Sequence, residues 1–174
     1  MADQSSGGGA PAGVTGRISG ALRSFFQWLS GTDGFAWIAP KIVPHADRLV
    51  YRLSGGRILM GDQVIPHLLL TTTGSKSGEP RQTPLACRPE PDGSFLVVGS
   101  NFGRESHPAW TSNLIKTPVA KVGFRGREMA VTAVLLQGAE RDDAWQRLLA
   151  NWPLYERYTE KSGRELRVFR LTPA

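Results

Sequence analysis

The sequence predicts an α+β fold, in which a small and mostly antiparallel β-barrel carries helices at its N-terminus and periphery. Short β-like runs recur at close spacing through the second half of the chain. Tight turns separate several of these runs, and helical patterns lie before, between and after them. The chain has 174 residues, of which 40% are hydrophobic, and this is enough for one substantial core and one domain.

The N-terminal part predicts a leader followed by two helical stretches. Residues 1–13 (MADQSSGGGAPAG) offer almost nothing to bury and are expected to be disordered, which leaves a single domain over residues 14–174. Apolar residues then recur every three or four positions over residues 14–29, as in an amphipathic helix. This helix either covers the core or rests on a membrane surface. A second helical stretch, about residues 36–53, is interrupted by two prolines.

The β-like runs have short apolar or alternating patterns with clear turns between them. The segment EPDG separates the second run from the third, and Arg125 and Gly126 form a tight hairpin between the fourth and the fifth. The expected strands cover residues 66–72, 83–89, 94–100, 119–124, 127–137 and 165–171. Helices are expected over residues 107–118, 140–152 and 154–163, with prolines or Gly163 at their ends.

Charge and cysteine content narrow the class of protein. The formal net charge of +6 and the pI near 10 favour anionic partners, but the cations are scattered singly along the chain. We therefore do not expect nucleic-acid binding. The lone Cys87 excludes an intrachain disulfide and fits a reducing compartment. No stretch of eighteen apolar residues or signal sequence is present, so the expected location is cytoplasmic, with membrane contact limited to a peripheral one.

The loop TTTGSKSGEPR follows an apolar strand and carries the donors that an anion needs. Glycines expose backbone N–H groups, and hydroxyls and two cations surround them. The spacing matches neither a Walker loop nor a Rossmann fingerprint. A plain hairpin and a phosphate or carboxylate site both remain open on these grounds. The residues concerned are Gly74, Ser75, Lys76, Ser77, Gly78 and Arg81.

Two further segments carry polar and aromatic residues in clusters. In GSNFGRESHPAWTSNL, Trp110 and Asn113 share one helix face, which could pack a ring system and hydrogen-bond its edge or could belong to the core. In NWPLYERY, the residues Trp152, Tyr155 and Tyr158 recur every three positions, either in the core or at the mouth of a pocket. No nucleophile elbow is present, and the histidines are too dispersed for a zinc site, so we expect no metal.

Together these three segments resemble the deazaflavin-dependent nitroreductase family, the split-barrel reductases that use reduced coenzyme F420. The likeness covers about residues 66–172. It implies an FMN-binding-like split β-barrel and an oxidoreductase that transfers a hydride from reduced F420 to a small acceptor, namely a quinone, an activated enone or a nitroaromatic compound. Alternatives that keep the barrel are an FMN-dependent reductase and a non-catalytic protein that sequesters a deazaflavin. The protein is expected to be a monomer or a dimer.

The resemblance also implies the site residues. The threonine-glycine loop would hold the phosphate and acidic tail of the coenzyme, with Lys76 and Arg81 as charged clamps. Tyr155 would orient the acceptor carbonyl or protonate it after hydride transfer. Trp152 stands where the family has tyrosine and cannot donate a phenolic proton, which disfavours nitro reduction. The expected cofactor contacts are Thr73, Gly74, Ser75, Lys76, Ser77, Arg81, Pro84, Ser100, Asn101, Trp110 and Asn113, and the expected substrate contacts are Trp152, Tyr155 and Tyr158.

Overall fold

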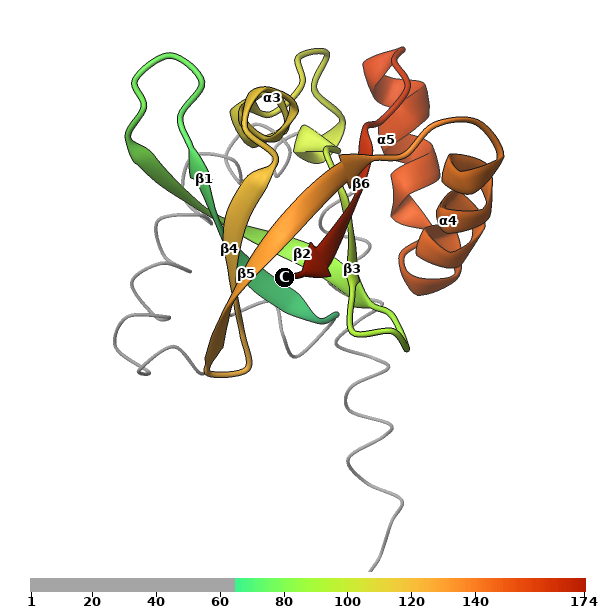
Figure 1. Cartoon of the computed structure of the whole chain (residues 1–174). Helices are drawn as coiled ribbons and strands as arrows, with labels where there is room; N and C mark the ends of the chain where they lie inside the picture. The colour runs from blue at the N-terminus through green and yellow to red at the C-terminus, as the bar shows by residue number, and fades with distance from the viewer. Residues whose placement is uncertain (1–64) are drawn as a thin grey trace, which may run out of the picture.

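The structure, a computed structural model, describes residues 65–174 (Figure 1). The expected leader over residues 1–13 and the two helical stretches over residues 14–29 and 36–53 lie outside the described residues. Nothing in the structure therefore tests the expected domain boundary.

Six strands form a closed barrel in the order β1-β2-β3-β6-β5-β4, and every neighbouring pair is antiparallel. The pairing of β1 with β4 closes the ring, with Leu70 opposite Val122. The predicted class, an α+β fold with a mostly antiparallel barrel, is confirmed. The strands are β1 (His67–Thr73), β2 (Pro80–Pro89), β3 (Phe95–Val98), β4 (Val119–Phe124), β5 (Arg127–Leu135) and β6 (Val168–Pro173).

Side-chain alternation along the strands fills the barrel from the inside. Successive side chains of a strand point to opposite faces, so Phe95 and Val97 lie inside while Leu96 and Val98 lie outside. The helix α3 (Ala109–Lys116) crosses one end of the barrel in Figure 1 and sends Trp110 into it. We call this cluster the barrel core: Leu68, Leu70, Cys87, Phe95, Val97, Trp110, Leu114, Ala120, Val122, Val131, Ala133, Phe169 and Leu171.

A second apolar layer lies on the outer face of β3 and β6. Helices α4 (Gly138–Asn151) and α5 (Leu154–Ser162) cover it, and Gly163 ends α5 in the left-handed conformation with φ of 62°. The predicted end of this helix is thereby confirmed. We call this cluster the helix layer: Ile65, Leu96, Val98, Leu136, Ala144, Leu148, Trp152, Leu154, Tyr155, Tyr158, Leu166 and Val168.

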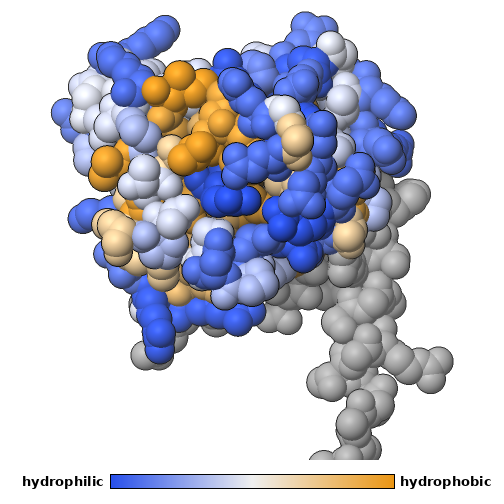
Figure 2. Space-filling model, turned by 45° about the vertical axis from the view of Figure 1, so that its right-hand side comes forward, coloured by the Kyte–Doolittle hydropathy of each residue, from blue (hydrophilic) through white to orange (hydrophobic). Residues whose placement is uncertain are grey.

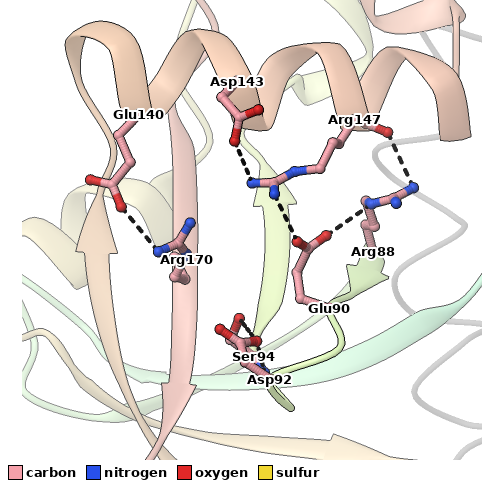
Figure 3. A network of polar contacts seen from close by, with 8 residues as sticks. All are labelled: Arg88, Glu90, Asp92, Ser94, Glu140, Asp143, Arg147 and Arg170. Carbon is pink, nitrogen blue, oxygen red and sulfur yellow. Dashed lines mark hydrogen bonds and ion pairs between the residues drawn. The ribbon is translucent and has the colours of Figure 1, made fainter.

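Ion pairs fasten α4 to the hairpin between β2 and β3 (Figure 3). The Glu90 carboxylate is only 7% exposed and lies 2.9 Å from Arg88 Nε and 3.4 Å from Arg147 Nη1. Arg147 also pairs with Asp143 at 3.1 Å, and Arg88 Nη1 donates to the Arg147 carbonyl at 3.3 Å. Because the partners come from both layers, this network fixes the position of α4 relative to the barrel.

Several boundaries differ from the predicted ones. Strand β2 begins at Pro80 rather than at residue 83, because Thr72 and Thr73 pair with Arg81 and Pro80 and extend the hairpin. Strand β6 covers residues 168–173 rather than 165–171. The predicted third strand stops at Val98, and a short 3-10 helix, η2 (Asn101–Gly103), follows it instead.

Candidate coenzyme and substrate site

The loop between β1 and β2 is a compact turn built on its two glycines. The Gly74 N–H donates to the Glu79 carbonyl and the Gly78 N–H donates to the Gly74 carbonyl, both at 2.8 Å. A Cβ atom on Gly74 would lie 2.6 Å from Ser77 Oγ, and Gly78 has φ of +72°. The positive φ favours glycine at position 78, whereas a side chain at position 74 would crowd Ser77 and the Glu79 carbonyl, and the turn presents residues 75–77 at its tip.

Helix α3 holds this loop in place through two side chains on one helix face, Asn113 and Lys116. Asn113 Oδ1 accepts from the Ser75 N–H at 2.9 Å, and Asn113 Nδ2 donates to Thr72 Oγ1 at 2.9 Å. One helical turn further on, Lys116 Nζ donates to the Ser75 carbonyl at 2.6 Å. Asn113 is 5% exposed, so its amide serves to fix the loop.

Two cations on the outer side of the loop are available to bind an anionic ligand. Lys76 and Arg81 are both exposed, and within residues 65–174 Lys76 has no ion pair or hydrogen bond. Arg81 Nη2 donates to Ser77 Oγ at 3.4 Å, which leaves other guanidinium donors. The backbone N–H groups of Lys76 and Ser77 are also not used within this part of the chain. Two cations, two N–H groups and hydroxyls on one rigid turn fit a phosphate or a polycarboxylate tail.

The loop between β3 and α3 is fastened by one arginine. Arg164 Nη2 donates to the carbonyls of Gly99 and Ser100 at 3.2 and 3.0 Å, and its Nε donates to the Arg104 carbonyl at 3.1 Å. Its Nη1 lies 2.9 Å from Nδ1 of His107. Burial, Arg164 and Arg167 together lower the pKa of His107. We call residues 99–107 the Arg164 loop.

Within the Arg164 loop, Ser100 and Asn101 are half-buried. Asn101 has φ of 49° and its Nδ2 donates to the Ser106 carbonyl at 2.9 Å. Pro84 lies on β2 opposite Leu69 of β1. The loop of residues 74–79 and the Arg164 loop both adjoin α3, so the fold brings most of the predicted coenzyme contacts to one end of the barrel. Their individual contacts with the coenzyme stay predictions.

Two predicted contacts lie deeper than a ligand-facing position. Trp110 is 4% exposed and packs against Phe169 at 5.5 Å between ring centroids, which favours the core interpretation of this residue. Asn113 shares its helix face, as expected, but it contacts the loop backbone. Trp110 therefore has too little exposed surface to stack against a ligand ring, the role predicted for this helix face.

The aromatic residues of α5 and the residue before it lie together in the helix layer. Trp152, Tyr155 and Tyr158 are 8%, 5% and 6% exposed, and the rings of Tyr155 and Tyr158 are 6.5 Å apart. As for Trp110, this burial favours the core interpretation of the row, and its contact with a substrate stays a prediction. Trp145 of α4 lies 6.1 Å from Tyr155. Burial is the largest cause that raises the pKa of the Tyr155 phenol above its ordinary value, so this hydroxyl stays protonated at neutral pH.

Three residues that fasten the site were missed by sequence reasoning. Lys116 had a usable signal, because it follows Asn113 by three positions on the same helix face. Thr72 lies in the threonine run, and nothing in the sequence indicates that Asn113 is its partner. Arg164 had no local signal, since its partners precede it by as many as 65 residues. Among the described residues, no group of three or more histidine, cysteine or acidic residues could hold a metal ion.

The comparisons with known proteins agree on one family. Residues 45–173 match the family model described as F420H(2)-dependent quinone reductase. An F420H(2)-dependent quinone reductase of Mycobacterium tuberculosis strain H37Rv is 33% identical over 129 residues, which cover 71% of this chain and 85% of that protein. A protein of Mycobacterium bovis that bears the same family name matches with the same identity and coverage.

Solved structures show the same fold. A structure described as an F420-H2 dependent reductase is 36% identical, has a TM-score of 0.56, and covers 61% of this chain and 93% of its own. A second, described as a domain-swapped dimer, is 32% identical with a TM-score of 0.58 and covers 71% and 94%. The expected split barrel and the resemblance to F420-dependent reductases are thereby confirmed. The match over most of the chain, and the cationic turn that this fold presents, establish that the chain belongs to the F420H2-dependent quinone reductase family.

Proposed function

We propose that this protein is a reductase that passes a hydride from reduced coenzyme F420 to a quinone. The observation that carries the proposal is the rigid turn of residues 74–79, whose exposed Lys76 has no counter-ion within the described chain. Reduced F420 supplies the hydride, so the protein needs no nucleophile of its own. Its task is to bind the coenzyme, orient the acceptor and exclude water.

In this proposal the anionic tail of the coenzyme binds at the outer side of the loop. Lys76 and Arg81 supply charge-assisted hydrogen bonds, and the N–H groups of Lys76 and Ser77, which have no acceptor within residues 65–174, supply neutral ones. The tether from Asn113 and Lys116 fixes these donors before the coenzyme arrives. Binding therefore costs little loop ordering.

Tyr155 is the residue that we assign to the acceptor. Its phenol stays protonated at neutral pH, so the O–H can donate a hydrogen bond to a quinone oxygen and stabilise the negative charge that develops there. Tyr155→Phe removes only the hydroxyl, so we expect a fall in kcat of about 10² or more, with coenzyme affinity unchanged. A loss of coenzyme affinity with an unchanged kcat would contradict this assignment.

Fluorescence titration with oxidised F420 tests the proposal. Saturable binding is expected in the parent chain, and Lys76→Ala should weaken it by about tenfold because one charge-assisted contact is lost. Lys121→Ala, at an exposed position of β4, is the charge-matched control and should bind as the parent does. Oxidation of the reduced coenzyme with menadione then tests turnover. Binding of FMN without binding of F420 would overturn the cofactor and leave the barrel unchanged.

The range of acceptors and the membrane contact are part of the same proposal. Trp152 has no phenol, so activated enones are expected to be better secondary acceptors than nitroaromatic compounds, as a parallel rate measurement would show. Quinones dissolve in lipid, and the amphipathic pattern of residues 14–29 supports a peripheral contact. No helix in the described part of the chain has the length and apolar character to cross a bilayer. Sedimentation with anionic lipid vesicles, before and after removal of residues 1–30, tests the contact.

A further inference from the structure

A pocket of about 250 Å³ opens beside the Arg164 loop, away from the proposed coenzyme turn. It lies where the end of β5 and the start of α4 meet the segment that precedes β6. Leu135 gives the pocket partly exposed apolar surface, with Leu136 and Val168 buried beneath it, and His107, Gln137 and Arg167 bring polar groups. Figure 2 shows an apolar patch next to hydrophilic side chains on the surface of the molecule, but the most exposed large apolar residues, Ile115, Val119 and Val134, do not line this pocket.

The protonation of His107 follows from its partner. A guanidinium group can only donate, so Nδ1 of His107, 2.9 Å from Arg164 Nη1, must accept. The imidazole is therefore neutral and carries its proton on Nε2. The lowered pKa of His107 agrees with a neutral ring. As a residue that lines the pocket, His107 offers an N–H donor held in a fixed orientation.

The net charge of the pocket comes from Arg167. Its Nη1 donates to the hydroxyls of Thr111 and Ser112 at 3.0 and 3.5 Å, which fixes the side chain but leaves its charge unbalanced. No carboxylate in residues 65–174 lies within 4.0 Å of Arg167 or Arg164.

The other two charged residues that line the pocket, Arg141 and Glu165, form an ion pair. Arg141 and Glu165 pair at 3.0 Å, and Arg141 also lies 3.6 Å from Asp142. A ligand therefore meets the unpaired guanidinium of Arg167, one imidazole N–H and the side chain of Leu135, while the Glu165 carboxylate is held by Arg141.

We propose that this pocket binds a small organic carboxylate. The carboxylate oxygens accept from Arg167 and from Nε2 of His107, and a compact apolar body rests against the partly exposed Leu135. The volume lies below the roughly 300 Å³ at which drug-sized ligands are accommodated, so the body is no larger than one aromatic ring. This site goes beyond the proposed reductase function, because it shares no residue with the coenzyme turn or the aromatic row.

Benzoate is the probe, titrated into the full chain without coenzyme and followed by calorimetry and by the His107 ring signals in NMR spectra. Saturable binding that shifts these signals is expected. Arg167→Gln should weaken it by at least about tenfold, because the charge-assisted contact is lost. Gln137→Glu, at an exposed position, should weaken it by like-charge repulsion. Arg127→Gln, a distant exposed cation, and Lys76→Ala should leave binding unchanged.

Four results would overturn the proposal. One is the lack of saturable benzoate binding, and another is an equal loss of affinity in Arg127→Gln, which would indicate non-specific charge attraction. Inorganic phosphate that binds as tightly as benzoate would show that the apolar contact with Leu135 contributes nothing and that the ligand class is wrong. If Arg167→Gln fails to fold, unchanged affinity in Gln137→Glu decides against the site. Failure of this site leaves the F420 titration unaffected, since Lys76 reports on that function separately.

Discussion

The two loops beside α3 use cations in opposite ways. The turn of residues 74–79 is fixed by Asn113 and Lys116 of α3, and its own Lys76 has no partner in the described part of the chain. The Arg164 loop is fixed by a cation whose donors are used on three carbonyls and one histidine. A cation near a site is therefore a ligand-binding group only where other residues already satisfy the backbone around it.

The largest effect is expected when the fastening cation is removed. Arg164→Met keeps the length of the side chain but leaves three carbonyls and His107 without their donor, and should lower the free energy of unfolding by about 3 kcal/mol. Denaturant titration measures this change. Arg157→Met, at an exposed position of α5, is the control and should alter stability by less than about 0.5 kcal/mol. Equal effects would remove the distinction between the two loops.

A smaller loss is expected when the amide tether of the turn is cut. Asn113→Ala leaves the Ser75 N–H and Thr72 without their partner and should cost about 2 kcal/mol of unfolding free energy. Because the turn is then less ordered before binding, F420 affinity should fall as well. Faster hydrogen exchange at the Ser75 amide would locate the effect, whereas unchanged exchange there would contradict the tether.

Lys116 is an intermediate case, because its cation holds the backbone of the turn and is not proposed to bind the coenzyme. Lys116→Met removes one exposed hydrogen bond to the Ser75 carbonyl and should lower the free energy of unfolding by about 0.5–1 kcal/mol. Lys76→Ala should not change stability by more than about 0.5 kcal/mol, although it weakens F420 binding. Thermal denaturation of both variants in parallel tests this contrast, which a larger loss in Lys76→Ala would break.

The smallest expected effect is a difference in pH dependence between the two loops. The pKa of His107 in the folded protein lies below its ordinary value of 6.5, so protonation favours the unfolded state. Its contribution to stability is present above about pH 6.5 and is lost as the pH falls through the folded pKa. Protonated Nδ1 can no longer accept from Arg164, so amide exchange should quicken in residues 99–107 on acidification, after correction for intrinsic rates. The turn of residues 74–79 should show no such step.

The sequence predicts most of the barrel because the strands follow from local patterns. Residues 129–135 alternate between buried or half-buried positions and exposed ones, as the side-chain period of a strand requires. The start of β2 was missed, because Glu79 and Pro80 have the composition of a turn and only the register with β1 makes Pro80 part of a strand.

The candidate site could be predicted less completely. Spacing showed that Trp152, Tyr155 and Tyr158 lie together, but their burial depends on strands far away in the chain. The role of Arg164 could not be predicted at all, because the residues it contacts are as many as 65 positions away. Local patterns report which side chains share a face, whereas tertiary packing decides what that face meets.

Strands β3 and β6 have one further consequence, because they belong to both apolar clusters. Phe95, Val97, Phe169 and Leu171 belong to the barrel core, whereas Leu96, Val98 and Val168 belong to the helix layer. A segment that unfolds exposes both of its faces at once, so the barrel cannot open along these two strands without releasing α4 and α5. The surface that carries Tyr155 and the scaffold that carries the coenzyme turn should therefore melt in one cooperative transition, with the slowest amide exchange along β3 and β6.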